Sequence, residues 1–322
     1  MHKLKIIDFD YGCGGFTKGL EDTGKFQVTR NLSLNNNNFR CYSNTHKNNF
    51  DLDDDMNDDY DIITYTPHLG NGLSRRGGGK FRKNEVNNLL LFVSFKKPQN
   101  IIIITKRDAF PYLQYSDKVC RINNNTPSKD IICNFLSDIG YSVYFFVLDE
   151  AGFGLPQHVY YNIYWASLNN VGSLYIKEGF GRFKQKYRTP QHVIADLKDD
   201  TQISWHNPDY KKREVCSLIE PGSSARNTSS VSQSNGYNRL SSDKIISHLS
   251  NDFYTVSSGF PSIHPWYDRP LTIREGARLF GLTDDFDWDS RLKNKEVASM
   301  IYNSFYPVVS KLIGFKLYKL LK

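Results

Sequence analysis

Residues 4–21 read LKIIDFDYGCGGFTKGLE, an apolar segment followed by clustered glycines and a mixed polar and apolar segment. Residues 4–9 predict a β-strand, Gly12-Cys13-Gly14-Gly15 predicts a tight turn, and a helical pattern begins at Phe16. A strand, a glycine-rich turn and a helix in this order open the nucleotide site of a doubly wound sheet. We therefore expect an α/β protein whose first turn borders a cofactor site.

The rest of the first half continues this alternation of strands and helices. Strands are predicted at 60–64, 100–105, 142–148 and 160–166, with helices at 85–96 and 128–139. This order predicts a mostly parallel sheet with covering helices. Residues 181–265 are rich in Ser, Asn, Gly, Lys and Arg and lack clear periodicity. Beyond them, Thr272 predicts a capped helix start, and residues 297–320 predict one amphipathic terminal helix.

The composition indicates a globular protein in a reducing compartment. Its 322 residues, 39% hydrophobic, suit one large domain and one smaller one. Five scattered cysteines without a C-x-x-C pair argue against a zinc site and against a disulfide framework. We expect no metal. The net charge of +7 favours a polyanionic partner, although a generic basic surface would explain it equally well.

The N-terminus has no signal-peptide pattern, and no apolar run approaches the roughly 20 residues that span a bilayer. We therefore expect a protein that is not secreted and has no membrane partner. Its expected location is the cytoplasm or the nucleoid, or the nucleus in a eukaryote. The Asn- and Lys-rich composition indicates an AT-rich genome, such as that of a phage or mobile element.

Two stretches carry a resemblance to a known family. Residues 8–16 resemble the motif D-L-F-C-G-x-G-G-F, and residues 269–286 are similar to R-P-L-T-x-R-E-x-A-R-L-x-G-F-x-D-x-F over their whole length. These are the first and ninth motifs of the DNA (cytosine-5) methyltransferases. The resemblance implies a Rossmann-like, S-adenosylmethionine-dependent methyltransferase fold with a small, irregular target-recognition-like domain. By this resemblance, residues 1–178 form the cofactor domain, 179–266 the small domain, and 267–322 a segment that returns to the large domain.

The same comparison shows replacements at the catalytic positions. The family's P-P-C-Q aligns with residues 66–70, so that its nucleophilic Cys falls on Leu69, or on His68 if the register shifts by one. The Glu of E-N-V aligns with Ile104. In Q-x-R-x-R, Gln157 remains, while Val159 and Tyr161 replace the arginines. We expect no catalytic residue at any of these positions.

The resemblance also implies a binding site for S-adenosylmethionine or S-adenosylhomocysteine. The expected cofactor-binding residues are Phe9, Asp10, Gly12, Gly14, Gly15, Phe16, Asp51 and Asn303. Asp10, however, replaces an apolar residue of the motif, and the family's ribose-binding Glu has no clear counterpart near residues 35–38. The alternative is that the glycines serve only the turn from strand to helix.

DNA contacts are expected from two basic segments, which the family uses to hold a duplex. They contain Arg75, Arg76 and Lys80 in the catalytic-loop region, and Arg182, Lys184, Lys186 and Arg188 in the small domain. Basic side chains neutralise phosphates, and the aromatic residues interleaved with the second segment could stack on bases. The alternatives are a disordered surface loop for the first segment and a charged strand edge for the second.

Together these features predict an inactive homologue, a pseudoenzyme, that binds double-stranded DNA, a protein partner or both in a regulatory role. Homo-oligomers are also compatible with the sequence. One alternative is an enzyme that modifies nucleic acid by other chemistry, with His68 or Asp10 recruited, and another is S-adenosylmethionine-dependent methylation itself. A third is a scaffold that no longer touches DNA.

Overall fold

The computed structural model describes residues 2–9, 13–32, 60–66, 89–106, 128–176, 188–197, 214, 216–223, 239–244, 262–288, 291–292, 294–302 and 304–322. The chain forms two compact units. Unit 1 comprises Met1–Leu148, Tyr160–Lys177 and Pro307–Lys322, and unit 2 comprises Asp149–Val159 and Glu178–Tyr306. The domain boundaries expected from the sequence stay a prediction.

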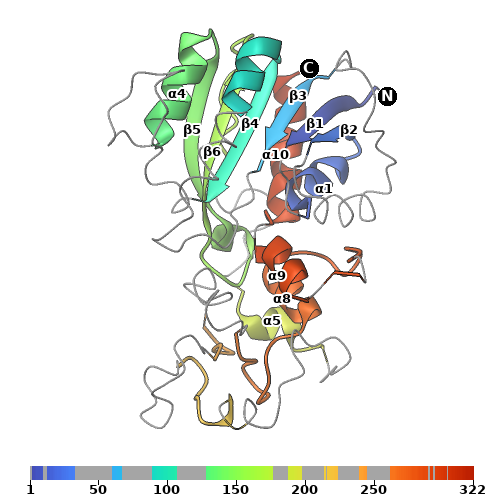
Figure 1. Ribbon diagram of the computed structural model, residues 1–322, viewed down its shortest axis with the longest axis vertical. Coiled ribbons are helices and arrows are strands. Elements are labelled where there is room, and N and C mark those ends of the chain that lie inside the picture. The colour runs from blue at the N-terminus through green and yellow to red at the C-terminus, as the bar shows by residue number, and fades with distance from the viewer. Residues whose placement is uncertain are drawn as a thin grey trace. The chain divides into compact units, whose positions relative to one another are not determined.

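Unit 1 is built on a six-stranded sheet with the order β2-β1-β3-β4-β6-β5 (Figure 1). The strands are β1 Leu4–Phe9, β2 Phe26–Leu32, β3 Ile62–Tyr65, β4 Asn100–Lys106, β5 Ser142–Asp149 and β6 Tyr160–Ser167. β1 runs parallel to β2 and β3, and β3 runs parallel to β4, whereas β6 is antiparallel to β4. The predicted α/β fold with a mostly parallel sheet is therefore confirmed.

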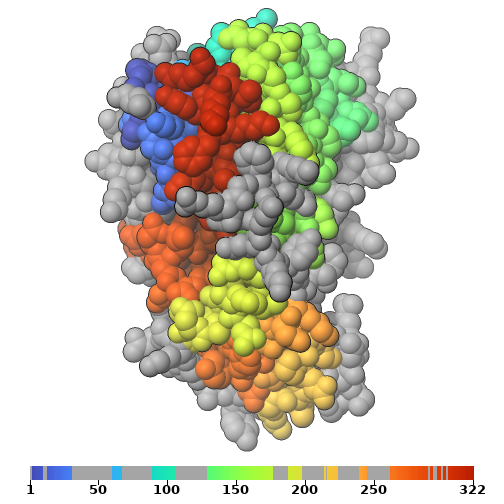
Figure 2. Space-filling model, turned by 180° about the vertical axis from the view of Figure 1, so that it is seen from behind, coloured from blue at the N-terminus to red at the C-terminus, as the bar shows by residue number. Residues whose placement is uncertain are grey.

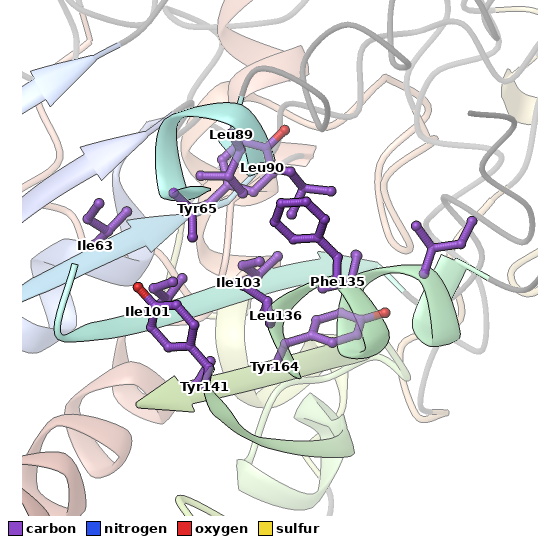
Figure 3. Close-up of a cluster of buried hydrophobic side chains, with 14 of the residues drawn as sticks. Ile63, Tyr65, Leu89, Leu90, Ile101, Ile103, Phe135, Leu136, Tyr141 and Tyr164 are labelled. Atoms are coloured by element: carbon purple, nitrogen blue, oxygen red, sulfur yellow. The ribbon is translucent and has the colours of Figure 1, made fainter. Parts of the chain in front are cut away.

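Helices cover both faces of this sheet because its central strands are apolar on both sides. The helix at 89–96 and α4 (Ser128–Asp138) pack on one face. Figure 3 shows that face, where Ile63, Ile101 and Ile103 meet Leu89, Leu90 and Phe135. α1 (Gly15–Glu21) and α10 (Pro307–Leu320) pack together, and α10 lies behind the strands in Figure 1. Residues 85–88 of the predicted helix lie outside the described ranges.

α1 and α10 approach each other at Gly19, where a side chain would not fit. A Cβ atom on Gly19 would lie 1.9 Å from Ser310 Oγ and 2.1 Å from the Pro307 carbonyl oxygen. The Ser310 hydroxyl donates to that Pro307 carbonyl at 2.9 Å and lies 3.4 Å from the Gly15 carbonyl. The C-terminal helix therefore contacts the first turn of α1 directly.

The single helix predicted for residues 297–320 is wrong. The chain instead forms α9 (Asn294–Tyr302) and α10, with Ser304–Tyr306 outside both helices. Pro307 explains the break, because proline lacks the N–H of a helix interior and disfavours helical geometry in the preceding residue. The Tyr306 N–H donates to the Glu150 carboxylate at 2.8 Å. The break coincides with the passage of the chain from unit 2 to unit 1.

The described part of unit 2 contains short elements and no regular sheet. Its elements are the 3-10 helix η1 (Glu150–Phe153), α5 (Pro190–Ile194), α8 (Ile273–Leu279), α9 and two isolated bridges at Ile263. Thr272 caps α8, as predicted, because its hydroxyl accepts a hydrogen bond from Glu275 N. Among the described helices, none has the length and apolar character needed to cross a bilayer.

We predict that Gly19→Ala destabilises unit 1 by about 1–3 kcal/mol, because the added methyl meets backbone atoms that cannot move aside locally. Gly314→Ala is the matched control on the facing helix. Its nearest contacts are side chains, Thr23 Cγ2 at 2.9 Å and Leu20 Cδ2 at 3.1 Å. Replacing a helical glycine gains up to about 1 kcal/mol, which offsets part of that strain. Urea unfolding would measure both, and equal stabilities of the two variants would contradict the proposed close contact.

Candidate cofactor site and the positions of the catalytic motifs

The predicted glycine turn connects β1 to α1. Gly14 caps α1 with φ of 80° and ψ of 21°, a left-handed conformation that glycine adopts without steric cost. Next to the turn, the buried Asp8 on β1 accepts a hydrogen bond from the Thr64 hydroxyl on β3 at 2.5 Å. The loop between strand and helix thus starts from a firmly held strand end.

Four predicted cofactor-binding residues fall within the described ranges. Gly14, Gly15 and Phe16 are buried, and Phe9 is half-buried. The left-handed Gly14 fits the role of a loop whose backbone approaches a ligand, since a side chain there would be strained. Asp10, Gly12, Asp51 and Asn303 lie outside the described residues.

The sheet brings together two of the positions at which the sequence predicts replaced catalytic residues. Ile104 on β4 pairs with Ile163 on β6, and Tyr161 lies two residues before Ile163 on the same strand. Because residues two apart share a face of a sheet, Ile104 and Tyr161 are diagonal neighbours on one face. Their exposed fractions are only 3% each. Val159 is buried in unit 2, and His68 and Leu69 lie outside the described residues.

The retained Gln157 has a structural contact. It is fully buried, and its Nε2 donates to the Leu279 carbonyl at the end of α8 at 3.0 Å. Glu150, on the same connection between β5 and β6, accepts the Tyr306 N–H. Gly281 also packs here, since a Cβ atom on it would lie 2.1 Å from the Tyr306 ring. These contacts tie residues 149–159 to the C-terminal part of unit 2.

A buried ion pair organises the segment at 269–286. Both terminal nitrogens of Arg269 donate to the Glu275 carboxylate, at 3.0 and 2.9 Å, and Thr272 N donates to it at 2.7 Å. His264 Nδ1 accepts from two backbone N–H groups, which leaves the proton on Nε2, 3.3 Å from Glu275. Burial raises the pKa of Glu275, but the hydrogen bonds from His264 and Arg269 outweigh it and hold the pKa at about 2.

An exposed network extends from the same segment. Arg278 binds Asp284 through two nitrogens, at 2.9 and 2.7 Å, and reaches Asp196 after α5 at 2.7 Å. Arg274 adds a second contact to Asp284 at 2.5 Å. Hydrogen bonds from Arg278 and Arg274 lower the pKa of Asp284 well below its ordinary value. The charged residues of segment 269–286 therefore stabilise both the conformation of the segment and its contact with the residues after α5.

Arg188 is the one predicted DNA-binding residue within the described ranges. Its guanidinium donates to the His192 carbonyl at 3.0 Å, at an exposed position just before α5. The other predicted DNA-binding residues lie outside the described ranges: Arg75, Arg76, Lys80, Arg182, Lys184 and Lys186.

Within the described part of the chain, no group of three or more His, Cys, Asp or Glu side chains could hold a metal ion.

Two polar contacts of unit 2 were not predicted. Asp149 accepts from Ala151 N and lies 2.7 Å from His158 Nδ1, which closes the connection between β5 and β6. Glu150 accepts from a residue 156 positions away. An acidic residue at a strand end is ordinary in a sequence, so no local pattern could have identified either contact.

The comparisons with known proteins agree with this architecture. The family model of the C-5 cytosine-specific DNA methylases matches residues 120–319, and the chain belongs to this family. The type II methyltransferase M.DdeI of Desulfomicrobium norvegicum is 24% identical over 88% of this chain and 79% of its own length. The chain therefore shares its sequence pattern with most of the length of that relative.

Solved structures share the fold over the full length. A candidate DNA modification methyltransferase encoded within an Escherichia coli prophage superposes with a TM-score of 0.72 and 17% identity, over 99% of both chains. The S. pombe Dnmt2 methyltransferase superposes with a TM-score of 0.69 and 16% identity, also over 99% of both. The methyltransferase fold expected from the sequence is confirmed.

We predict that Glu275→Gln destabilises unit 2 by about 3–5 kcal/mol, because it leaves the buried Arg269 charge without its counterion. The carboxyl pKa is depressed in the folded state, so its stabilisation is complete above the unfolded pKa and disappears as pH falls toward 2. Between pH 5 and 2 the wild type should therefore lose stability through this group, and Glu275→Gln should lack that component. Urea unfolding across this pH range measures both effects.

Asp284→Asn is the matched control, since it removes a carboxylate of the same segment that binds two arginines at the surface. Its cost should stay at about 1 kcal/mol or less, as for other exposed ion pairs. Equal costs for the two variants would show that burial of the Glu275 pair does not matter.

Proposed function

We propose that the chain is a catalytically inactive member of its family that binds duplex DNA, a protein partner or both in a regulatory role. Ile104 carries this proposal. It occupies the position of the family's catalytic Glu, is 3% exposed and lies opposite Ile163 in the sheet. An aliphatic side chain offers no hydrogen bond to a flipped base. The residues aligned with the nucleophile and the two arginines also support inactivity: they are Leu69, Val159 and Tyr161.

Several losses together argue more strongly than one. In the cytosine-5 reaction a thiolate attacks the base while acidic and basic groups hold it, so these groups act as a unit. When groups act as a unit, removing one is already close to removing all. The relatives are named as methyltransferases, whereas the residues of this chain at these positions differ from the family motifs.

Cofactor binding is a separate part of the proposal. S-adenosylmethionine or S-adenosylhomocysteine would be held by Phe9, Gly14, Gly15 and Phe16, together with Asp10, Gly12, Asp51 and Asn303. When bound, the first of these ligands supplies an activated methyl group. The backbone of the turn would contact the ligand, and Phe16 would contribute an apolar surface. The left-handed Gly14 supports this assignment, because a glycine in that conformation lets the backbone approach a ligand closely.

The proposed DNA contact uses two basic segments of the chain. Arg75, Arg76 and Lys80 precede the helix at 89–96, and Arg182, Lys184, Lys186 and Arg188 precede α5. Membership of a DNA methylase family and the net charge of +7 support a polyanionic ligand. Losing catalytic groups does not reduce this charge.

We predict no methyl transfer to cytosine in DNA or RNA. Tritiated S-adenosylmethionine would be incubated with varied duplexes at stoichiometric protein, with an active family member in parallel. Leu69→Cys alone should not restore activity, because the Glu and both Arg positions remain replaced. Incorporation above background by the wild type would refute inactivity and turn attention to His68 and Asp10 as recruited groups.

Gly14→Asp should abolish any binding of S-adenosylmethionine or S-adenosylhomocysteine measured by calorimetry, because it adds a side chain and a negative charge at the turn. Gly24→Asp is the matched control. Gly24 also has positive φ, at 70°, but a Cβ there meets nothing within 4 Å. A wild type that binds, with Gly14→Asp binding equally well, would remove the turn from the site.

Arg75→Ala/Arg76→Ala should weaken duplex binding for all sequences and flatten the dependence of log K on log salt by roughly one to two units, since each phosphate contact contributes about 0.9. Lys96→Ala/Lys129→Ala, which removes two basic side chains elsewhere in unit 1, is the control. Fluorescence anisotropy against salt concentration gives the slopes. A wild-type Kd no tighter than about 10⁻⁴ M at physiological salt would instead favour a scaffold that does not use DNA.

A further inference from the structure

α10 and the two residues after it form the most basic segment of the described chain. Residues 307–322 contain four lysines, at 311, 316, 319 and 322, and no acidic residue. The whole chain carries a net charge of +7, so this short segment holds more than half of that excess. None of these lysines belongs to the segments used in the proposed function.

One side of the helix is buried, and three of the four lysines of the segment lie on the opposite side. Val309, Ile313 and Leu317 are completely buried. Lys311, Phe315 and Tyr318 follow one another at spacings of four and three residues, which places them on one side of a helix. Phe315 is 44% exposed, and Figure 2 shows α10 in red at the surface of unit 1. We call Lys311, Phe315, Tyr318, Lys319 and Lys322 the outer face of α10.

The lysine charges of this face are not neutralised by the described residues. Lys311, Lys319 and Lys322 form no ion pair with any described side chain. Lys316 donates to the Tyr175 carbonyl, which carries no formal charge. The acids at the end of the adjacent α1 have other contacts, since Asp22, just after the helix, pairs with Lys18, and Glu21 accepts from Val28 N. The face therefore presents a net positive charge.

Aromatic rings lie between these charges. Lys25 and Lys322 sit over the Tyr318 ring, at 5.2 and 5.6 Å from its centroid, and the exposed Phe315 ring is one turn away. Lysines bind phosphates, and aromatic rings bind the faces of unstacked bases, so this mixture suits a nucleic acid. A membrane-surface helix instead needs a broad free apolar face, and here that face is buried in the fold.

We infer that the outer face of α10 is a second nucleic-acid contact surface, which binds the phosphate backbone independently of the two segments of the proposed function. The rise from Lys311 to Lys322 is about 16 Å. A duplex carries about ten phosphate charges over that length, enough to engage every lysine of the face.

The test compares Lys311→Gln/Lys319→Gln/Lys322→Gln with Lys96→Gln/Lys97→Gln/Lys129→Gln. The control removes the same charge from the helix end at 96–97 and from α4. A labelled 30-base-pair duplex and a 30-nucleotide single strand serve as probes, and anisotropy against salt gives affinity and slope. The outer-face variant should lower the duplex slope by about two to three units, at about 0.9 per contact, and the control by less than one.

Combining variants separates this inference from the proposed function. Each triple variant is also made with Arg75→Ala/Arg76→Ala. If only Arg75→Ala/Arg76→Ala weakens binding, the outer face is refuted while the proposed function stands. If only the outer-face variant weakens it, the inference stands and the predicted contacts of Arg75 and Arg76 fail.

Phe315→Ala keeps every charge and tests the aromatic contribution. It should weaken single-strand binding by at least about five-fold and leave duplex binding unchanged, because only unstacked bases can meet the ring. Vesicles of phosphatidylserine and phosphatidylcholine provide the last comparison. Vesicle binding that depends on the outer face, without any such dependence for either nucleic acid, would overturn the inference.

Discussion

The close approach of α1 and α10 at Gly19 is the contact on which the rest of unit 1 depends. Both helices lie against the same part of the sheet, and only a residue without a side chain lets the Pro307 and Ser310 turn reach α1. Ser310 then contacts the Gly15 carbonyl, so the last helix of the chain supports the turn that begins at Gly14. The C-terminal segment therefore contributes to the position of this turn, together with the N-terminal strand and helix.

The residues that match the family motifs and those expected at its catalytic positions differ in physical role. Four matching residues are buried and hydrogen-bonded: Gln157 to the Leu279 carbonyl, Arg269 to Glu275, and Glu275 N to the Thr272 hydroxyl. Loss of any one of them would leave a buried polar group without a partner. The catalytic positions face the opposite situation. Isoleucine at position 104 packs in an apolar sheet, and a carboxylate there would need to be desolvated. Folding therefore requires the hydrogen bonds of the first group and favours an apolar side chain at position 104. A well-matched ninth motif therefore indicates the fold and does not indicate catalytic activity.

Charge is unevenly distributed over the described residues. In unit 2, the arginines of the ninth motif are bound by Glu275, Asp284 and Asp196, and their charge is largely used inside the protein. On α10, three lysines have no such counterions. The net charge of the chain therefore does not describe where a polyanion would bind. Among the described residues, lysines without an acidic partner lie on this C-terminal helix.

Local patterns in the sequence determined the glycine turn, the Thr272 cap, the family and every strand of the sheet except β2, because each depends on residues close together in the chain. The β-branched run at 100–105 predicts a central strand, and the capping box needs only Thr272 and Glu275. Only the tertiary structure decided that Glu150 accepts the Tyr306 N–H just before Pro307, and that Ile104 and Tyr161 are neighbours in the sheet. These features join residues tens to more than a hundred positions apart. A periodicity covers a few turns of one element, and it contains no information on which distant backbone group a buried carboxylate will bind.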